Sequence, residues 1–291
     1  MTYTIKNEYL EATVNELGAE LISLKSADGC EYIWQGDPKY WQGHAPIMFP
    51  FCGRLWEGKY TYLGKEYSLG NHGFARHSLF SLYSAKESEI TLLLKSDEQT
   101  KQNYPFEFLF YVTFSLKGKE LKISHRVENK DEKDLIFALG GHPAFNVPLG
   151  GEGKFEDWYL ELDKKCEAIR VDLSEKCFRT GNDKPYLSEG VKKIPLSHSL
   201  FDRDAIFLYN VPKRVSLLSE KSRRGVRVSF NDMKYVGFWH MPRTDAPYVC
   251  IEPWTSQPSY DGAIDSLSTK AEMICLPSGY SFKNGYSIEV I

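Results

Sequence analysis

The sequence lacks the short motifs that mark several common classes of enzyme. It contains no Walker A phosphate loop, no GxGxxG dinucleotide pattern, no HExxH zinc pattern and no GxSxG nucleophile turn. Readings as a nucleotide-binding protein, a zinc protease or an α/β-hydrolase therefore lose their usual support.

Cysteine pairs and long apolar runs are also missing. The six cysteines are scattered, with no CxxC pair and no Cys/His spacing typical of zinc. Two of them, Cys250 and Cys275, lie within apolar runs, where a free thiol packs as a small hydrophobic group. No apolar stretch approaches the ~20 residues of a membrane span, and no signal-peptide pattern is recognised. We expect a cytoplasmic protein with reduced thiols that does not contact a membrane.

Basic charge is not concentrated anywhere in the chain. The net charge is −3 and the pI is about 6.2, and the densest basic run spans only residues 221–227. Nucleic-acid binding requires a concentrated basic face. We therefore expect no nucleic-acid partner.

The dominant hydrophobic period is two, which is typical of strands. Apolar residues alternate from Phe106 to Leu116, a Lys-Gly-Lys turn follows at 117–119, and alternation resumes from Leu121 to Val127. This pattern predicts a hairpin with one buried face. Further strands are expected at 60–62, 66–68, 89–95, 158–162, 205–209, 214–218, 225–230, 272–276 and 286–291.

Helical periodicity is nearly absent, and only single turns are expected, at 37–42 and 197–201. Without a strand–helix–strand rhythm, a parallel α/β sheet is disfavoured. Many short strands between Gly, Pro and Asn turns favour an all-β fold, a large antiparallel β-sandwich. The 291 residues allow one large or two small domains. With no linker or repeat in view, we expect a single domain over residues 1–291.

Four segments, at 45–54, 71–77, 139–146 and 248–254, each place a charged or titratable group beside Gly or Pro at the end of an apolar run. Glu252 follows the β-rich run Tyr-Val-Cys-Ile and should enter the protein with that strand. A buried carboxylate is costly unless paired, and burial would raise its pKa and strengthen it as a base. The alternative is a structural ion pair with an arginine.

Two histidines stand in glycine-bounded turns. His142 follows Gly140 and Gly141 and precedes a proline, a setting that lets a ligand approach closely. His72 lies in a similar turn. Both are candidates for binding or proton transfer, against the alternative of structural histidines. His125 alternates with apolar residues and is expected to be a buried or half-buried strand residue.

Three further polar residues are candidate ligand contacts. Arg54 and Arg76 carry planar donor groups suited to sugar hydroxyls, carboxylates or phosphate, or are surface charges. Asp204 precedes an apolar strand and either accepts hydrogen bonds from a ligand or caps a turn.

At these segments the chain resembles the aldose 1-epimerase (galactose mutarotase-like) superfamily, and within it the bacterial LacX-type subgroup. The likeness runs nearly end to end. It rests on Asn-Glu-Leu-Gly-Ala-Glu-Leu at 15–21, Phe-Pro-x-x-Gly-Arg ending at residue 54, His-Gly-Phe-Ala-Arg at 72–76, Gly-His-Pro-x-Phe-Asn at 141–146, Glu-Pro-Trp at 252–254 and Leu-Pro-x-Gly at 276–279.

The resemblance implies a β-sandwich with a sugar site in a cleft on one broad face. It implies that His142 protonates the ring oxygen of an aldohexose, that Glu252 takes the proton from the anomeric hydroxyl, and that Arg54, His72 and Asp204 hold the sugar. We add Arg76 to the sugar-binding set. Galactose mutarotases usually have His-Gly-Gly and Glu-Thr-Gln where this chain has His-Gly-Phe at 72–74 and Glu-Pro-Trp at 252–254.

Mutarotation opens a cyclic hemiacetal, which needs one acid and one base and no cofactor or metal. Free imidazole titrates near ~6.5, so His142 should need a favourable neighbour or a small rise in pKa to act as an acid. The expected partner is a small sugar, and the expected assembly is a monomer or homodimer. Two alternatives are a hexose-6-phosphate mutarotase, with arginines holding the phosphate, and a non-catalytic sugar-binding or sensor protein. A glycosidase is disfavoured because it normally needs two carboxylates.

Overall fold

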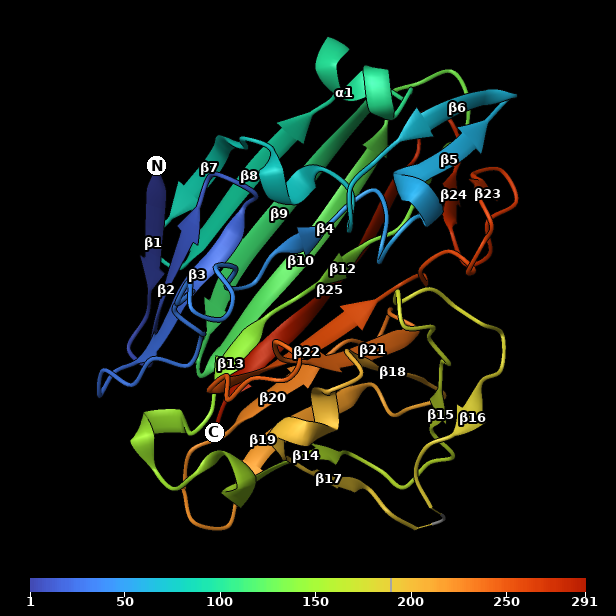
Figure 1. Cartoon of the computed structure of the whole chain (residues 1–291). Helices are drawn as coiled ribbons and strands as arrows, with labels where there is room; N and C mark the ends of the chain where they lie inside the picture. Colours follow the sequence, from blue (N-terminus) through green and yellow to red (C-terminus); the bar gives the residue numbers. More distant parts are fainter. Residues whose placement is uncertain (189) are drawn as a thin grey trace.

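Antiparallel strands dominate the structure, a computed structural model that describes residues 1–188 and 190–291 (Figure 1). Among the described strand pairs, only β23 (Asp265–Ser266) and β5 (Lys59–Tyr62) run parallel. The predicted all-β antiparallel sandwich is confirmed.

The larger of the two main sheets has nine strands, and its centre is formed by three strands of ten residues each. In spatial order its strands are β17 (Lys193–Pro195), β14 (Trp158–Leu162), β19 (Arg214–Ser219), β20 (Val226–Ser229), β25 (Ser281–Val290), β10 (Glu120–Asn129), β9 (Phe108–Lys117), β8 (Glu89–Lys95) and β7 (Ser81–Lys86).

The second main sheet stacks on the first, as Figure 1 shows for β21 and β22. Its strands are β16 (Lys184–Pro185), β15 (Ile169–Arg170), β18 (Ile206–Tyr209), β21 (Tyr235–Trp239), β22 (Tyr248–Trp254), β12 (Gly140–Gly141) and β4 (Ile47–Met48), with β13 (Ala144–Asn146) paired to β22.

Smaller elements complete the described chain. The short strands are β1 (Thr2–Lys6), β2 (Leu10–Asn15), β3 (Glu20–Ser26), β6 (Lys65–Ser68), β11 (Leu135–Phe137) and β24 (Ile274–Leu276). The helical elements are α1 (Glu98–Asn103) and the 3₁₀ turns η1 (Trp56–Gly58), η2 (Ala75–His77), η3 (Leu149–Gly151), η4 (Phe155–Asp157) and η5 (His198–Phe201). The turn expected at 197–201 is thus present.

The predicted central hairpin is formed by β9 and β10. Phe114 pairs with Ile123 and Leu116 with Leu121, so the alternating apolar side chains share one buried face. His125 is 1 % exposed on this face, as expected, and burial lowers its pKa to about 4. The hydrophobic core lies between the main sheets, where Phe49 after β4 stacks on Phe110 of β9 with ring centroids 4.6 Å apart.

The sequence did not predict which strands the last two strands pair with. Both predicted segments are strands, but β24 pairs with β11, while β25 lies between β10 and β20. The two neighbours in sequence therefore belong to different sheets.

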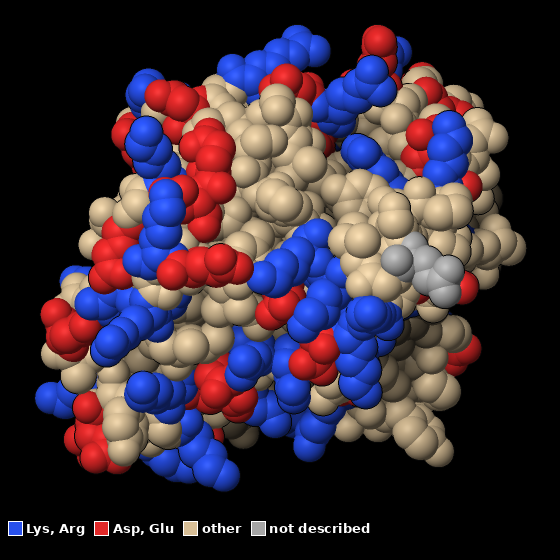
Figure 2. All heavy atoms as spheres, turned by 90° about the horizontal axis from the view of Figure 1, so that it is seen from below, with Lys and Arg blue, Asp and Glu red and all other residues tan. Residues whose placement is uncertain are grey.

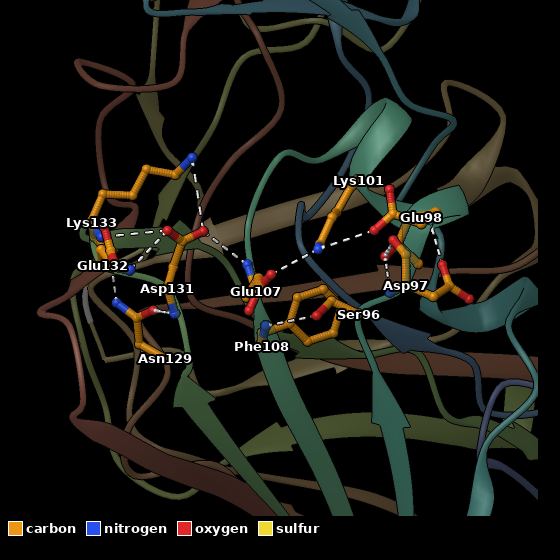
Figure 3. A network of polar contacts seen from close by, with 11 residues as sticks. Ser96, Asp97, Glu98, Lys101, Glu107, Phe108, Asn129, Asp131, Glu132 and Lys133 are labelled. Atoms are coloured by element: carbon orange, nitrogen blue, oxygen red, sulfur yellow. Dashed lines mark hydrogen bonds and ion pairs between the residues drawn. The ribbon is translucent and has the colours of Figure 1, made fainter.

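Helix α1 was not expected from the sequence. Asp97 caps it by accepting from the Thr100 amide, and Lys101 bridges to Glu107 just before β9 (Figure 3). Asp131 in turn accepts from the Glu107 amide. This network ties the ends of β9 and β10 to α1, and its residues are largely exposed and structural.

Acidic and basic side chains intermingle over the face shown in Figure 2. Within the described residues, none of the helices has the length and hydrophobicity that crossing a bilayer requires.

Candidate active site

A cavity of about 390 Å³ brings together all six predicted site residues. Its lining includes Arg54, His72, Arg76, His142, Asp204 and Glu252. A larger hollow of about 770 Å³ lies over the nine-stranded sheet and contains none of them. The smaller cavity is therefore the candidate site, since it gathers acid, base and cationic groups from segments far apart in the sequence.

Strand β22 places both residues proposed for proton transfer. Glu252 lies within β22, and the two short strands that flank His142 each pair with β22: Gly140 opposite Trp254, and Ala144 opposite Cys250. The backbone around His142 is thus held against the strand that carries Glu252. His142 Nε2 lies 3.3 Å from Glu252 Oε1.

Glycine at 141 is required by the close packing behind His142. A Cβ on Gly141 would lie 2.5 Å from the ring of Tyr286 in β25, well inside contact distance. The glycine seen in the sequence thus lets the strand before His142 approach the nine-stranded sheet.

His72 presents a hydrogen-bond donor to the cavity. The amide of Gly53 donates to His72 Nδ1 at 3.0 Å, which leaves the ring proton on Nε2. Burial lowers the pKa of His72 well below its ordinary value, with His142 and Arg76 adding to the effect. The ring therefore stays neutral, and it meets the His142 ring edge-on with centroids 5.6 Å apart.

The remaining predicted residues surround the pair. Arg76 in η2 is partly buried, which lowers its pKa, although Glu20 and Glu252 oppose this. Arg54 is exposed at the rim. Asp204 has a left-handed backbone at φ 72° and accepts hydrogen bonds from the Ala205 amide and from the thiol of Cys177.

Three tryptophans complete the cavity. The rings of Trp41 and Trp239 lie 4.9 and 5.6 Å from the His142 ring, and Trp254 Nε1 donates to Glu252 Oε2 at 3.2 Å. Trp41 and Trp239 were missed by the sequence reasoning. Their local sequence carries no signal of a ligand site, because a tryptophan in an apolar context is most often core.

Burial shifts the pKa values of the two proton-transfer candidates in opposite directions. It lowers the pKa of His142 to about 3, with Arg76 acting in the same sense. It raises the pKa of Glu252 well above its ordinary value, although the Trp254 hydrogen bond and Arg76 oppose it. Among the described residues, His142 Nδ1 and Glu252 Oε1 have no hydrogen-bond partner.

His142 was expected to need a favourable neighbour or a small rise in pKa; burial lowers the pKa instead, and Glu252 is the neighbour, 3.3 Å away. Both directions favour a neutral His142 beside a protonated Glu252, because burial disfavours the charged form of each side chain. One transferable proton is enough for acid–base chemistry. When it moves from Glu252 to His142, Glu252 becomes the carboxylate base and His142 becomes the imidazolium acid.

The same corner of the site contains potential metal ligands. Donor atoms of His142, Cys250 and Glu252 lie within 4.8 Å of one another. A His/Cys/Glu set suits zinc by chemistry, and burial holds the Cys250 thiol protonated by raising its pKa well above its ordinary value.

Comparisons with known proteins identify the family of the chain. The profile of the family described as aldose 1-epimerase matches residues 1–262. The chain belongs to the aldose 1-epimerase family. It is similar to the plasmid-encoded protein LacX of Lactococcus lactis subsp. lactis, with 36% identity over 264 residues and 88% of each chain covered. This supports the LacX-type likeness.

Solved structures of other proteins share the fold over nearly the whole chain. The galactose mutarotase related enzyme of Lactobacillus acidophilus is 36% identical with a TM-score of 0.95, covering 100% of this chain and 97% of the other. A galactose mutarotase-like protein of Lactobacillus casei is 31% identical with a TM-score of 0.94, covering 100% of both. A putative aldose 1-epimerase of Escherichia coli, 14% identical with a TM-score of 0.78 and covering 100% and 99%, shares the fold.

Proposed function

We propose that the protein is a mutarotase that interconverts the α and β anomers of an aldohexose, with His142 as acid and Glu252 as base. The observation that carries this is the 3.3 Å contact between His142 Nε2 and Glu252 Oε1 inside a cavity of sugar size. The family membership supports the same class of reaction.

The short distance between acid and base suits the substrate. The anomeric hydroxyl oxygen and the ring oxygen of a cyclic hemiacetal are bonded to the same carbon, so they lie close together. Two proton-transfer groups that act on them must therefore be close together as well. A wider separation would suit a different reaction, such as hydrolysis across a bond.

Ring opening then needs only proton movements. The Glu252 carboxylate takes the proton from the anomeric hydroxyl while His142 Nε2 gives a proton to the ring oxygen. The bond from the anomeric carbon to the ring oxygen breaks, and an aldehyde forms. Rotation about the bond to the next carbon presents the other face, and the reverse transfers close the ring as the second anomer.

The other polar residues position the sugar. His72 Nε2–H and the Arg76 guanidinium donate hydrogen bonds to hydroxyls, Asp204 accepts them, and Arg54 contacts the substituent nearest the rim. The indole faces of Trp41 and Trp239 pack against C–H faces of the ring.

Exchange NMR and polarimetry on purified α-anomers of glucose and galactose test the proposal. We expect His142→Asn and Glu252→Gln each to reduce kcat by at least about 10²-fold, the low end for one acid–base group. Circular dichroism should show an unchanged fold. Wild-type rates in either variant would reject the assignment.

The same measurement distinguishes a mutarotase from a non-catalytic sugar-binding protein with this fold. Such a protein would bind sugar in calorimetry without accelerating anomer exchange. The adjacent acid and base favour the enzyme, because binding alone has no need of that pair.

A further inference from the structure

A buried thiol lies beside the proposed acid and base and has no role in the proposed reaction. Cys250 is two residues before Glu252 in β22, so both side chains are on the same face of the strand, and Cys250 is 0 % exposed. Donor atoms of Cys250, Glu252 and His142 all lie within 4.8 Å of one another. Within residues 1–188 and 190–291, no other group of three or more His, Cys, Asp or Glu donors is spaced in this way.

Two paired strands hold the three side chains in register. Ala144 of β13 lies opposite Cys250 of β22. The same antiparallel register, continued by two residues toward β12, places His142 opposite Glu252. The donors therefore stand on neighbouring backbone segments, and no loop has to close to bring them together.

The separation of two of the donors matches a zinc site. His142 Nε2 and Glu252 Oε1 are 3.3 Å apart. In a tetrahedral site with zinc bonds of about 2.0–2.1 Å, nitrogen and oxygen ligands are separated by about 3.3 Å. A zinc-bound sulfur is about 3.6 Å from such ligands, so the Cys250 sulfur has to move by at most roughly 1 Å to bind the same ion.

Two polar atoms of this cluster are buried without a hydrogen-bond partner. Among the described residues, His142 Nδ1 and Glu252 Oε1 are unpaired, although their side chains are more than nine-tenths buried. A buried polar atom without a partner calls for an explanation such as an ion or a water molecule. A cation held between His142 and Glu252 would satisfy the free carboxylate oxygen.

We propose that His142, Cys250 and Glu252 bind a zinc ion that blocks turnover, at what is here named the inhibitory zinc site. Three protein ligands leave a fourth position for water, and the cavity lined by His142 and Glu252 gives the ion access. The ion takes the imidazole and carboxylate lone pairs that the proposed reaction uses, so metal binding and turnover exclude each other. The inhibition rests on the proposed function, but the metal site does not.

Charge balance favours zinc in this dry position. The thiolate and the carboxylate together carry two negative charges, which the ion cancels, while the imidazole binds as a neutral ligand. The thiol proton and any proton on the carboxyl group leave to solvent, so no net charge is buried. Magnesium and calcium fit less well because they prefer oxygen ligands alone.

Zinc titration of chelator-treated protein, with anomer exchange of galactose followed by NMR, tests the inhibition. We expect wild-type turnover to fall as zinc binds and to return with EDTA. Cys250→Ala removes one ligand and leaves the acid and base in place. It should retain most of the metal-free rate and need at least about tenfold more zinc for half-inhibition. Cys250→Ser, which keeps the size of the side chain, should show the same shift and serves if alanine lowers stability.

Two other cysteines provide matched controls. Cys52 is a buried free thiol outside the cluster, and Cys177 lines the cavity beside Asp204. Cys52→Ala and Cys177→Ala should both keep the wild-type sensitivity to zinc. Equal sensitivity of Cys250→Ala and the wild type would overturn the proposal. Loss of sensitivity in Cys177→Ala alone would also overturn it, because the metal would then lie elsewhere in the cavity.

Cobalt binding separates the metal site from the proposed function. Cobalt(II) substitutes for zinc and absorbs strongly in the near ultraviolet when a thiolate is one of its ligands. We expect this band in the wild type and not in Cys250→Ala. If the band is present but the wild type accelerates no sugar, the mutarotase proposal fails and the metal site stands. If the wild type accelerates galactose exchange but shows no thiolate band, the metal site fails and the mutarotase proposal stands.

Discussion

At the scale of single residues, burial controls the chemistry of the candidate site. Glu252 is 2 % exposed and His142 is 8 % exposed. Burial favours the uncharged form of each side chain over its charged form. Burial therefore favours a proton on Glu252 beside a neutral His142, and the proposed reaction moves that proton to His142. This arrangement differs from an exposed imidazole beside an exposed carboxylate, and the difference is measurable in two ways.

The first measurement is the pH dependence of kcat/KM. The active form holds one proton on the pair. A second proton binds to His142 near its pKa of about 3, and the first leaves only above the raised pKa of Glu252. We expect no loss of rate as pH falls from neutral toward the pKa of His142, and a loss as pH rises through the raised pKa of Glu252, recorded by exchange NMR with the buffer-catalysed rate subtracted. An acid limb near ~6.5, the value of free imidazole, would contradict this picture.

The second measurement is the pH dependence of stability in Glu252→Gln. The folded pKa of Glu252 is raised above the ordinary value of 4.5, so its contribution is fully present below pH 4.5 and is lost as pH rises toward the folded pKa. Glutamine has no carboxyl group to ionise, so the variant does not lose this stability as pH rises. We expect the variant to match the wild type at pH 4 and to have a higher free energy of unfolding than the wild type at pH 8.

Urea titrations at both pH values would record this difference. A variant less stable than the wild type at pH 8 would show that the carboxylate is ionised and paired in the folded protein.

At the scale of elements, three short pieces of strand position the site. β12, β13 and β22 bring His142 to Glu252, and the contact depends on how closely β12 approaches β25 behind it. Sequence reasoning recognised the glycines before His142 but could not show what they face, because Tyr286 lies far along the chain.

Replacement of Gly141 by alanine tests this approach. The new Cβ would fall 2.5 Å from the Tyr286 ring, so either the ring or β12 must shift, and a shift of β12 moves His142 with it. A displacement of about 1 Å at a reacting group costs on the order of 10²-fold in rate. We expect that loss in kcat with a folded protein.

Tyr286→Leu removes the ring atoms that clash and should restore part of the activity to Gly141→Ala. The single variant Tyr286→Leu is the control. If Gly141→Ala keeps the wild-type rate, the position of His142 does not depend on this contact.

At the scale of the whole molecule, we expect the core of the sandwich to determine stability without affecting the chemistry of the cavity. Phe114 in β9 is 1 % exposed and pairs with Ile90 on one side and Ile123 on the other, within the core. Its substitution should affect stability and leave the cavity intact.

We expect Phe114→Ala to lower the free energy of unfolding by about 3–5 kcal/mol, as for other large-to-small changes in a core. Its kcat at 20 °C should stay within about twofold of the wild type, because the effects of distant sites without shared contacts are usually independent to within about 0.3–0.5 kcal/mol. Denaturant titration and exchange NMR give the two values. A loss of turnover without a loss of stability would show that the core is coupled to the site.

Much of the fold was accessible from local patterns. Alternation in β9 and β10, the turn between them and the strand segments at β5, β6, β8, β14, β19 and β20 were predicted within a few residues. In the second sheet, β18 was predicted at 205–209, and the run before Glu252 was recognised as the strand that is β22. The partners of β24 and β25, helix α1 and the other short strands of the second sheet were not predicted, because pairing depends on contacts remote in sequence. The single-domain expectation stays a prediction.

The sequence by itself determined the strand content, the turn positions and the six polar candidates, since alternation and glycine or proline placement act over a few residues. Only the tertiary structure decided that His142 and Glu252 touch, that burial shifts their pKa values in opposite directions, and that Trp41 and Trp239 lie beside the pair. Distance and desolvation arise from segments brought together by folding, and these quantities have no local signature in the chain.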